Sequence, residues 1–389
     1  MRILFASSEV APFSKTGGLG DVAFALPAAL AERGHEMVVL SPLYGCVERE
    51  RHRLEPMGIS LPEGRIWAAP REAGLLFAFL EAPAFDRPGI YGEGGDYPDN
   101  AARFGTFSKS LLPAARALNF FPDILHLNDW QTAPATLFSE GVPTVLTIHN
   151  LGYQGLFPLA EAPILFGREE IPKVWIHYDQ LAFLKGGIAT ADLVTTVSPT
   201  YAEEIRQTEL GFGLGDVLRA RGERLVGILN GIDTRVWDPA TDPHLAENFT
   251  RAERRGKRAC KRALQEEMAL PVDEEAFLVG MVTRIAGQKG FDLLLAVLGE
   301  LLEREIQLVV LGSGDPAMEA ALRAFRDRHP ERLALRFAFD EALAHRIYAG
   351  CDAFLMPSSY EPCGLAQLYA LRYGALPIVR ATGGLRDTV

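Results

Sequence analysis

The sequence predicts an α/β protein of two doubly wound domains, each a parallel sheet covered by helices on both faces. Short apolar runs alternate with longer amphipathic runs along most of the chain, as repeated βαβ units do. The chain has 389 residues, more than one domain usually needs. A stretch with two prolines, several turn formers and little periodicity, 230–249, interrupts the alternation. We therefore predict one domain over 1–240 and a second over 241–389.

The expected elements follow the apolar runs in chain order. In the first half we expect strands at 2–8, 36–41, 65–69, 75–81, 123–127 and 143–148, with the clearest helices at 22–33 and 101–118. In the second half we expect strand 277–283, helix 289–304, strand 307–311, helix 316–329, strand 333–339, helix 341–349, strand 352–356, helix 364–373 and strand 376–380. Ligands of such sheets bind beyond the carboxyl ends of the strands, so we expect the active site in a cleft between the two domains.

The charge balance argues against a nucleic-acid partner. The net charge is −11, and phosphate backbones are bound by positive surfaces. One basic run, 251–262, could be a nucleic-acid patch or the exposed face of a helix that opens the second domain. One glutamate and an Ala-Cys pair interrupt its arginines and lysines, and the chain as a whole is acidic, which favours the exposed helix face.

Cysteine usage and hydropathy indicate a cytoplasmic protein. The four cysteines, Cys46, Cys260, Cys351 and Cys363, form no C-x-x-C pair and no zinc-binding spacing with histidine. They are too few for a disulfide framework, so we expect free thiols. The N-terminus reads as a first strand and lacks the pattern of a signal peptide. No apolar run reaches about 18 residues, so no membrane span is expected.

The glycine-rich stretch SKTGGLGDV, 14–22, allows three interpretations. Read from Gly18, it matches the dinucleotide fingerprint G-x-G-x-x-A, but the preceding loop is long and the second strand does not end in an acid. It could be a flexible turn without a ligand. Phosphate binding is favoured, because Lys15 and the glycine amides lie beside a helix N-terminus. Asp21 could contact a ligand, cap the helix or stabilise its first turn.

Polar residues follow two further strands of the first half. His149 and Asn150 come directly after the strand at 143–148, and Asp129 follows the strand at 123–127. Because polar groups at the carboxyl ends of parallel strands line the ligand site, these residues are candidates for ligand contact.

The second half offers cations and one carboxylate at equivalent positions. Arg284 and Lys289 flank glycines between a strand and a helix, where they could clamp a pyrophosphate. Glu361 lies on the loop after the strand at 352–356. A single surface charge is the alternative interpretation for each of these residues when it is considered alone.

Several motifs together resemble one family. KTGGLGDV, GDYPDNAARF, IHNLGYQG, NGID, TRIAGQKGFDLL and EPCGLAQLYAL, in this order and at this spacing from residue 2 to 389, resemble the bacterial glycogen synthases and plant starch synthases. The resemblance implies a GT-B architecture of two Rossmann-like domains facing across a cleft. It implies transfer of glucose from ADP-glucose to the non-reducing end of an α-1,4-glucan with retention, an ADP-glucose:α-1,4-glucan glucosyltransferase activity.

The resemblance also implies site residues. His149, Glu361, Arg284 and Lys289 would be catalytic: His149 binds the sugar near the reacting carbon, the two cations neutralise the departing pyrophosphate, and Glu361 holds the donor glucose hydroxyls. Lys15 and Gly18 would contact the diphosphate or the sugar, and Tyr97 and Asp129 would line the sugar and acceptor side. The remaining substrate-binding residues would be Asp21, Asn150, Gln154 and the backbone of Cys363, Gly364 and Leu365.

The expected chemistry needs no metal or cofactor, because cations and a helix N-terminus stabilise the diphosphate and no D-x-D motif is present. Retention is expected by a front-face mechanism, since no second acid accompanies Glu361 in the sequence. Two departures stand out. Related retaining transferases carry a second glutamate eight residues after the first, where this chain has Tyr369. The chain also stops at GGLRDTV, where the family continues with a C-terminal segment. The alternative function is therefore a non-catalytic glucan- or nucleotide-binding fragment, and the choice between ADP- and UDP-glucose stays open.

Overall fold

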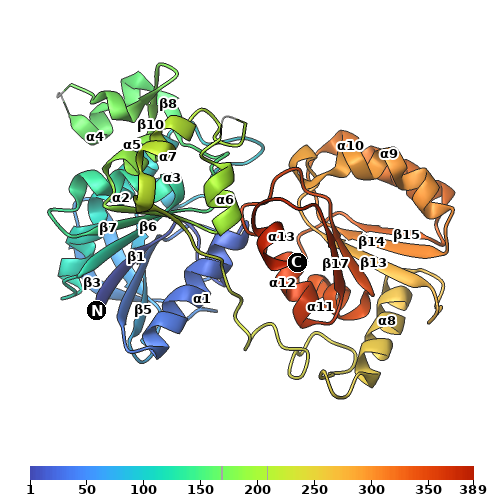
Figure 1. Cartoon of the computed structure of the whole chain (residues 1–389). Helices are drawn as coiled ribbons and strands as arrows, with labels where there is room; N and C mark the ends of the chain where they lie inside the picture. The colour runs from blue at the N-terminus through green and yellow to red at the C-terminus, as the bar shows by residue number, and fades with distance from the viewer. Residues whose placement is uncertain (168–169, 208) are drawn as a thin grey trace. The chain divides into compact units, whose positions relative to one another are not determined.

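The computed structural model describes residues 1–167, 170–207 and 209–389, which form two compact units (Figure 1). The first unit is Met1–Asn230 and the second is Gly231–Val389. Each unit is built around its own sheet, so each is described by itself. The boundary of independently folding domains after residue 240 stays a prediction.

A nine-stranded sheet forms the centre of the first unit, in the order β12-β11-β7-β6-β1-β2-β5-β4-β3. Its parallel strands are β1 (Arg2–Ala6), β2 (Glu36–Pro42), β5 (Leu75–Glu81), β6 (Ile124–Asn128), β7 (Thr144–Ile148), β11 (Leu193–Thr196) and β12 (Leu225–Gly227). The central strand β1 is almost wholly buried, as expected for an apolar strand with both faces covered.

The edge of this sheet corrects the expectation of a purely parallel arrangement. The predicted strand at 65–69 is present as β4 (Gly64–Ala68), but it runs antiparallel to β5 and pairs with a further antiparallel strand, β3 (Glu55–Leu61). Most side chains of β3 are at least partly exposed. An edge strand of this kind lacks the apolar run on which the sequence analysis relied, and it includes Pro56 and Gly58.

The helices of the first unit surround this sheet (Figure 1). They are α1 (Gly18–Glu32), α2 (Asn100–Ala117), α3 (Asp129–Thr132), α4 (Pro163–Phe166), α5 (Phe183–Thr190), α6 (Pro199–Glu204) and α7 (Gly215–Ala220). A small antiparallel sheet of β8 (Leu156–Pro158), β9 (Ile176–His177) and β10 (Gln180–Ala182) lies near α4 and α5. Helix α1 starts four residues before the predicted start at residue 22, so two of the three glycines of the glycine-rich stretch belong to its first turn.

The second unit contains a five-stranded parallel sheet in the order β15-β14-β13-β16-β17. The strands are β13 (Phe277–Val282), β14 (Ile306–Leu311), β15 (Leu333–Arg336), β16 (Ala353–Met356) and β17 (Leu376–Val379). The helices are α8 (Arg255–Glu267), α9 (Phe291–Leu302), α10 (Pro316–Arg328), α11 (Glu341–Gly350), α12 (Ala366–Arg372) and α13 (Gly383–Thr388). Every strand and helix that was predicted between 277 and 380 is present in this order.

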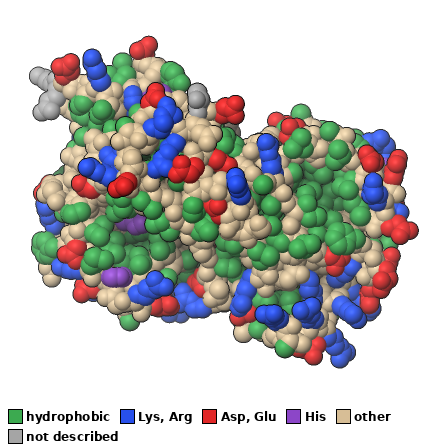
Figure 2. Space-filling model, viewed as in Figure 1, with side chains coloured by type: hydrophobic (Ala, Val, Ile, Leu, Met, Phe, Trp, Pro, Cys, Tyr) green, Lys and Arg blue, Asp and Glu red, His purple; other side chains and the backbone are tan. Residues whose placement is uncertain are grey.

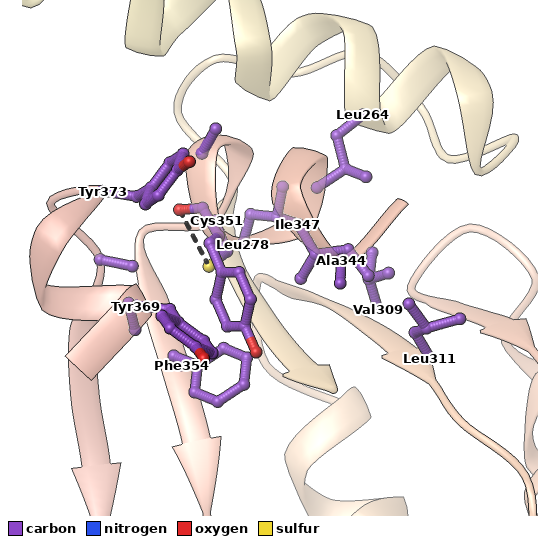
Figure 3. Close-up of a cluster of buried hydrophobic side chains, with 14 of the residues drawn as sticks. Leu264, Leu278, Val309, Leu311, Ala344, Ile347, Cys351, Phe354, Tyr369 and Tyr373 are labelled. Atoms are coloured by element: carbon purple, nitrogen blue, oxygen red, sulfur yellow. Dashed lines mark hydrogen bonds between the residues drawn. The ribbon is translucent and has the colours of Figure 1, made fainter. Parts of the chain in front are cut away.

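Two hydrophobic clusters cover the two faces of this sheet. Leu278 of β13 belongs to the cluster with Ile347, Phe354 and Tyr369, which Figure 3 shows between the sheet and the helices. Its neighbour Val279 belongs to the other cluster, which packs against α9 and α10. Because successive strand residues point to opposite faces, continuous apolar runs supply both clusters.

The basic run that opens the second unit forms helix α8 as predicted, but two of its lysines point inward. The Nζ atom of Lys257 donates hydrogen bonds of 3.0 Å to the carbonyls of Ala349, Cys351 and Tyr373. Lys261, which is buried, contacts Asp352 at 2.9 Å. The prediction of an exposed basic face is therefore wrong at these two positions, because the lysines supply donors to carbonyls at helix ends and to the partly exposed carboxylate of Asp352.

The irregular segment at the start of the second unit is packed against its core. The Trp237 ring stacks between His345 at 3.9 Å and Tyr369 at 3.7 Å between ring centroids. Asp242 is buried and accepts hydrogen bonds from His345 and Tyr373. Tyr369, the residue in place of a second glutamate, thus serves as one side of an aromatic sandwich that holds this segment.

Candidate active site

The glycine-rich stretch of the first unit places Lys15 against the first turn of α1. Lys15 Nζ lies 2.7 Å from Asp21 Oδ1, and both side chains are largely covered. A Cβ atom on Gly20 would lie 3.1 Å from Cγ of Lys15, so a glycine there lets the lysine stem pass close to the helix. Gly17 is the N-cap residue of α1 and Gly18 its first residue. Asp21 is therefore a first-turn acid paired with a lysine, and the N-cap interpretation is wrong.

Glu9 is a buried residue that the sequence analysis missed. Its side chain is 3% exposed and accepts hydrogen bonds from Thr16 N, Thr16 Oγ1, Gly17 N and the hydroxyl of Tyr91. A glutamate soon after a buried strand and directly before Val10, Ala11 and Pro12 is a sequence signal for burial of an acid that needs donors. Glu9 therefore belongs to the polar framework of the glycine-rich stretch.

The ends of β6 and β7 bring Asp129 and His149 together. Asp129 is 8% exposed and adopts a left-handed backbone conformation, with φ of 56°. Its Oδ1 accepts hydrogen bonds from the backbone amides of His149 at 2.7 Å and Asn150 at 3.4 Å. Burial raises the pKa of Asp129 to about 7, although these two hydrogen bonds act in the opposite direction. Asp129 thus fixes the loop that begins at His149.

The His149 ring has a defined protonation state at neutral pH. Burial, with a smaller contribution from neighbouring His126, lowers its pKa to about 3. Its Nε2 lies 2.8 Å from Oδ1 of Asn128, whose amide nitrogen donates to the carbonyl of Ala6. Because this arrangement leaves Asn128 Oδ1 as an acceptor, His149 donates from Nε2, and its Nδ1 is the acceptor. His149 is therefore a neutral hydrogen-bonding group.

Asn150 and Gln154 shape the loop that follows. Asn150 Oδ1 accepts a hydrogen bond from Gly152 N at 2.9 Å, which closes a tight turn. Gln154 Nε2 donates to the carbonyl of Phe212 at 2.8 Å. Gly155 has φ of 62° and packs on the Trp130 ring, where an added Cβ would lie 2.5 Å from Cε3. Both side chains that were predicted to contact substrate therefore also stabilise this loop: Asn150 bonds within it, and Gln154 bonds it to Phe212.

Tyr97 lies on a separate loop before α2. The guanidinium groups of Arg87 and Arg103 lie 4.7 and 4.9 Å from the centroid of its ring. Arg103 is buried, and Arg87 forms a bidentate ion pair with Asp99 at 2.7 Å. These cations hold the Tyr97 ring in place from within the first unit.

In the second unit, Lys289 and Glu361 form an ion pair. Lys289 Nζ lies 2.6 Å from Glu361 Oε2, which also accepts a hydrogen bond from Ser358 at 3.1 Å. The two side chains are only 16% and 9% exposed. Gly290, next to Lys289, has φ of 75° and lies so close to Pro357 that a Cβ would be 2.1 Å from its carbonyl oxygen. This close approach brings the two loops together.

Arg284 is exposed on the segment between β13 and the turn that carries Lys289. The neighbouring loop approaches this segment closely, because Cβ atoms on Gly312 and Gly314 would lie 1.8 and 2.0 Å from the carbonyl oxygens of Thr283 and Ile285. Glycines at these positions therefore let the two loops pack side by side.

The segment Cys363–Gly364–Leu365 connects Glu361 to helix α12. Cys363 is buried, and Gly364 has φ of 72°. Gln367, which is fully buried, donates from Nε2 to the carbonyls of Cys363 and Gly364 at 2.9 Å each. The backbone of this segment is thus fixed by a side chain of the helix that follows it.

Three further observations concern surface charge, metal-binding groups and membrane-spanning helices. Basic and acidic side chains are interspersed on the face of the described residues seen in Figure 2. Within 1–167, 170–207 and 209–389, no group of three or more His, Cys, Asp or Glu side chains is placed to hold a metal ion. None of the helices in this described part is both long and apolar enough to cross a bilayer.

Two doubly wound α/β units in one chain, each with a lysine–carboxylate pair, agree with the GT-B class of glycosyltransferases. The family model described as the starch synthase catalytic domain matches residues 2–220, and the model for glycosyl transferases group 1 matches residues 265–389. The chain belongs to the glycogen synthase and starch synthase family. The predicted family, fold class and glycogen synthase activity are confirmed.

Individual relatives agree over the whole chain. The glycogen synthase of Anaeromyxobacter dehalogenans (strain 2CP-C) is 52% identical, covering 100% of this chain and 86% of that protein. The glycogen synthase of Myxococcus xanthus (strain DK1622) is 47% identical with the same coverage. The catalytic domain of starch synthase IV from Arabidopsis thaliana, solved bound to ADP and acarbose, is 35% identical with a TM-score of 0.91, covering 100% of this chain and 84% of that chain.

Proposed function

We propose that this enzyme transfers glucose from ADP-glucose to the non-reducing end of an α-1,4-glucan with retention at the anomeric carbon. The observation that carries the proposal is the covered Lys289–Glu361 pair, which offers an ammonium for a diphosphate and a carboxylate for sugar hydroxyls at one point. The Arabidopsis relative, with ADP and acarbose bound, supports a nucleoside diphosphate and a glucan-like chain as ligands of this class.

On the donor side, Lys289 and Arg284 stabilise the negative charge that grows on the diphosphate as the glycosidic bond breaks. An ammonium that is only 16% exposed exerts a stronger field than one in bulk water. Glu361 holds the hydroxyls of the donor glucose, together with the backbone of Cys363, Gly364 and Leu365. In the absence of donor, Glu361 keeps Lys289 in position, so the diphosphate meets a preorganised cation.

In the first unit, His149 is a neutral ring whose Nδ1 accepts a hydrogen bond from a sugar hydroxyl, because its Nε2–H is donated to Asn128. A pKa of about 3 excludes the imidazolium as a general acid at neutral pH. Lys15, in its pair with Asp21, and Gly18 contact the diphosphate or the sugar. Tyr97, Asp129, Asn150 and Gln154 line the sugar and acceptor side, each from a loop with its own hydrogen bonds.

Retention follows a front-face course in this proposal. The bond between the anomeric carbon and the phosphate oxygen breaks, the acceptor hydroxyl oxygen attacks from the same face, and its proton passes to the departing phosphate oxygen of ADP. Negative charge develops on the leaving group, which is where Lys289 and Arg284 act. Trapping of a covalent glucosyl-enzyme on a carboxylate would replace this course with a double displacement.

Incorporation of radiolabelled glucose into glycogen tests the proposal directly. We expect incorporation from ADP-glucose to exceed that from UDP-glucose, and the new linkages to be cleaved by an enzyme specific for α-1,4 bonds. Binding of ADP or maltooligosaccharide without any incorporation would instead support the alternative, a non-catalytic glucan- or nucleotide-binding protein. A cytoplasmic location, the independence of metals and the lack of a nucleic-acid partner stay predictions from the sequence.

A further inference from the structure

We propose that Glu9 is a positioning residue that holds two separate loops of the first unit, one with Lys15 and one with Tyr97, in a fixed relation to each other. This inference rests on the proposed function, because Lys15 and Tyr97 act there on the donor and acceptor sides. Glu9 itself contacts neither ligand in this proposal. It acts through the hydrogen bonds that its carboxyl group accepts from both loops.

The first arm of the network holds the residues next to Lys15. Glu9 Oε2 accepts hydrogen bonds from Thr16 N at 2.6 Å and Gly17 N at 3.1 Å, and Oε1 accepts from Thr16 Oγ1 at 2.7 Å. Gly17 is the N-cap residue of α1 and has no side chain to cap the helix. The carboxyl group of Glu9 thus lies at this helix start, where the helix dipole favours negative charge. Lys15 directly precedes the residues that are held.

The second arm holds the loop of Tyr97. The hydroxyl of Tyr91 donates to Glu9 Oε1 at 2.6 Å and lies 2.8 Å from Ser8 Oγ. The Tyr91 carbonyl accepts hydrogen bonds from Tyr97 N and Asn100 Nδ2, both at 2.9 Å. The loop is therefore closed on itself, and the Tyr91 hydroxyl fastens it to Glu9.

A buried cation completes this second arm. Arg103, 1% exposed, donates from Nη1 to Asn100 Oδ1 at 2.6 Å, and its guanidinium lies 4.9 Å from the Tyr97 ring centroid. A path of contacts therefore runs from Glu9 through Tyr91 and Asn100 to the face of Tyr97. Displacement of Tyr91 would change the support on which this ring rests.

A carboxyl group suits this position better than an amide of the same size. Four donors converge on its two oxygens, whereas a glutamine would offer one acceptor oxygen and direct an N–H₂ group at some of these donors. Because Glu9 is only 3% exposed, water cannot replace a lost partner easily. Burial of an acid here is favourable only while both loops supply their donors.

The two arms can be separated by substitutions that each remove one hydroxyl. Thr16→Val removes the Oγ1 donor of the first arm, and Tyr91→Phe removes the donor of the second arm. Glu9→Gln disturbs both arms. Thr144→Val is the matched control, because Thr144 Oγ1 donates to Asp192 at 2.8 Å in the same unit, at the opposite end of β7 from His149.

The test measures dissociation constants of ADP and maltoheptaose by calorimetry, KM for ADP-glucose and for glycogen, and melting temperature, on the full chain. We expect Thr16→Val to weaken ADP binding and raise the KM for ADP-glucose roughly tenfold, with the glucan constants within about twofold. Tyr91→Phe should weaken maltoheptaose binding and raise the KM for glycogen roughly tenfold, with the ADP and ADP-glucose constants within about twofold. Glu9→Gln should change the constants for both ligands. Thr144→Val should lower only the melting temperature.

Two results would overturn the inference: equal changes in donor and glucan constants in both hydroxyl variants, or a fall in melting temperature with unchanged constants. The binding data keep this test independent of catalysis. If the wild-type chain binds both ligands but incorporates no glucose, the proposed function fails while the inference is still decided by the dissociation constants. If the wild-type chain binds neither ADP nor maltoheptaose, both fail together.

Discussion

Replacement of Asp129 by asparagine should make the first unit more stable at neutral and alkaline pH. Burial raises the pKa of Asp129 from 3.8 to about 7, so between these values the folded chain holds a proton that the unfolded chain releases. The free energy of unfolding therefore falls as the pH rises through this window. A shift of about three units corresponds to on the order of 4 kcal/mol, since each unit is about 1.4 kcal/mol.

The substitution changes little else at this position. The Oδ1 atom of an asparagine can still accept the hydrogen bonds from His149 N and Asn150 N, and asparagine tolerates the φ of 56° found here. Urea unfolding followed by tryptophan fluorescence, at pH values from about 4.5 to 8, measures the difference between Asp129→Asn and the wild type. That difference should grow with pH and level off above about pH 7.

Asp192 provides a control of opposite sign. Hydrogen bonds from the Thr144 backbone and hydroxyl lower the pKa of Asp192, so its stabilising contribution is present at neutral pH and is lost as the pH falls. Asp192→Asn should therefore lose stability relative to the wild type at neutral pH. A stability difference between Asp129→Asn and the wild type that stays constant from pH 4.5 to 8 would show that burial does not raise the pKa of Asp129.

Three further substitutions test single contacts. In steady-state kinetics, Lys289→Ala should lower kcat by about a hundredfold, on the order of 3 kcal/mol of barrier, with little change in the KM for glycogen. A variant in which only glucan binding weakened would contradict a role of Lys289 at the departing diphosphate. Lys257→Met should lower the free energy of unfolding by about 1–3 kcal/mol in chemical denaturation, because three carbonyls lose their donor. Arg258→Met, on the exposed face of the same helix, should change it by no more than about 0.5 kcal/mol. Equal losses in the two variants would argue against the carbonyl contacts. Gly155→Ala should destabilise the first unit by more than about 1 kcal/mol and alter the fluorescence of Trp130, and an unperturbed variant would exclude the close ring contact.

For the site residues, the sequence predicted positions in the fold but not contacts or burial. The positions of Asp129 and His149 after β6 and β7 were predictable, because a polar residue after an apolar run marks the end of a strand. Their mutual contact and the pKa of about 7 at Asp129 depend on the pairing of the two strands and on burial. Glu9 was not predicted: its apolar neighbours indicate burial, but the four donors that converge on it come from two loops that no local stretch of sequence brings together.

The alternation of strands and helices, the two-unit organisation and the family could all be predicted from the amino-acid sequence. These properties are local or repetitive: apolar periodicity reports whether a segment is buried as a strand or as a helix, and motifs are contiguous. The edge strand β3 was not predicted, because its side chains are largely exposed and its sequence therefore lacks this apolar periodicity.

Which charged side chains contact each other depends on how distant segments pack together. Lys289 and Glu361 are 72 residues apart, and their 2.6 Å contact exists because β13 and β16 are neighbours whose loops end at the same edge of the sheet. The sequence alone predicts Lys257 as an exposed charge, but the packing of α8 places its ammonium group against three carbonyl groups. Strand order and helix packing set these distances. Both depend on contacts between segments far apart in the chain, so no local stretch of sequence encodes them.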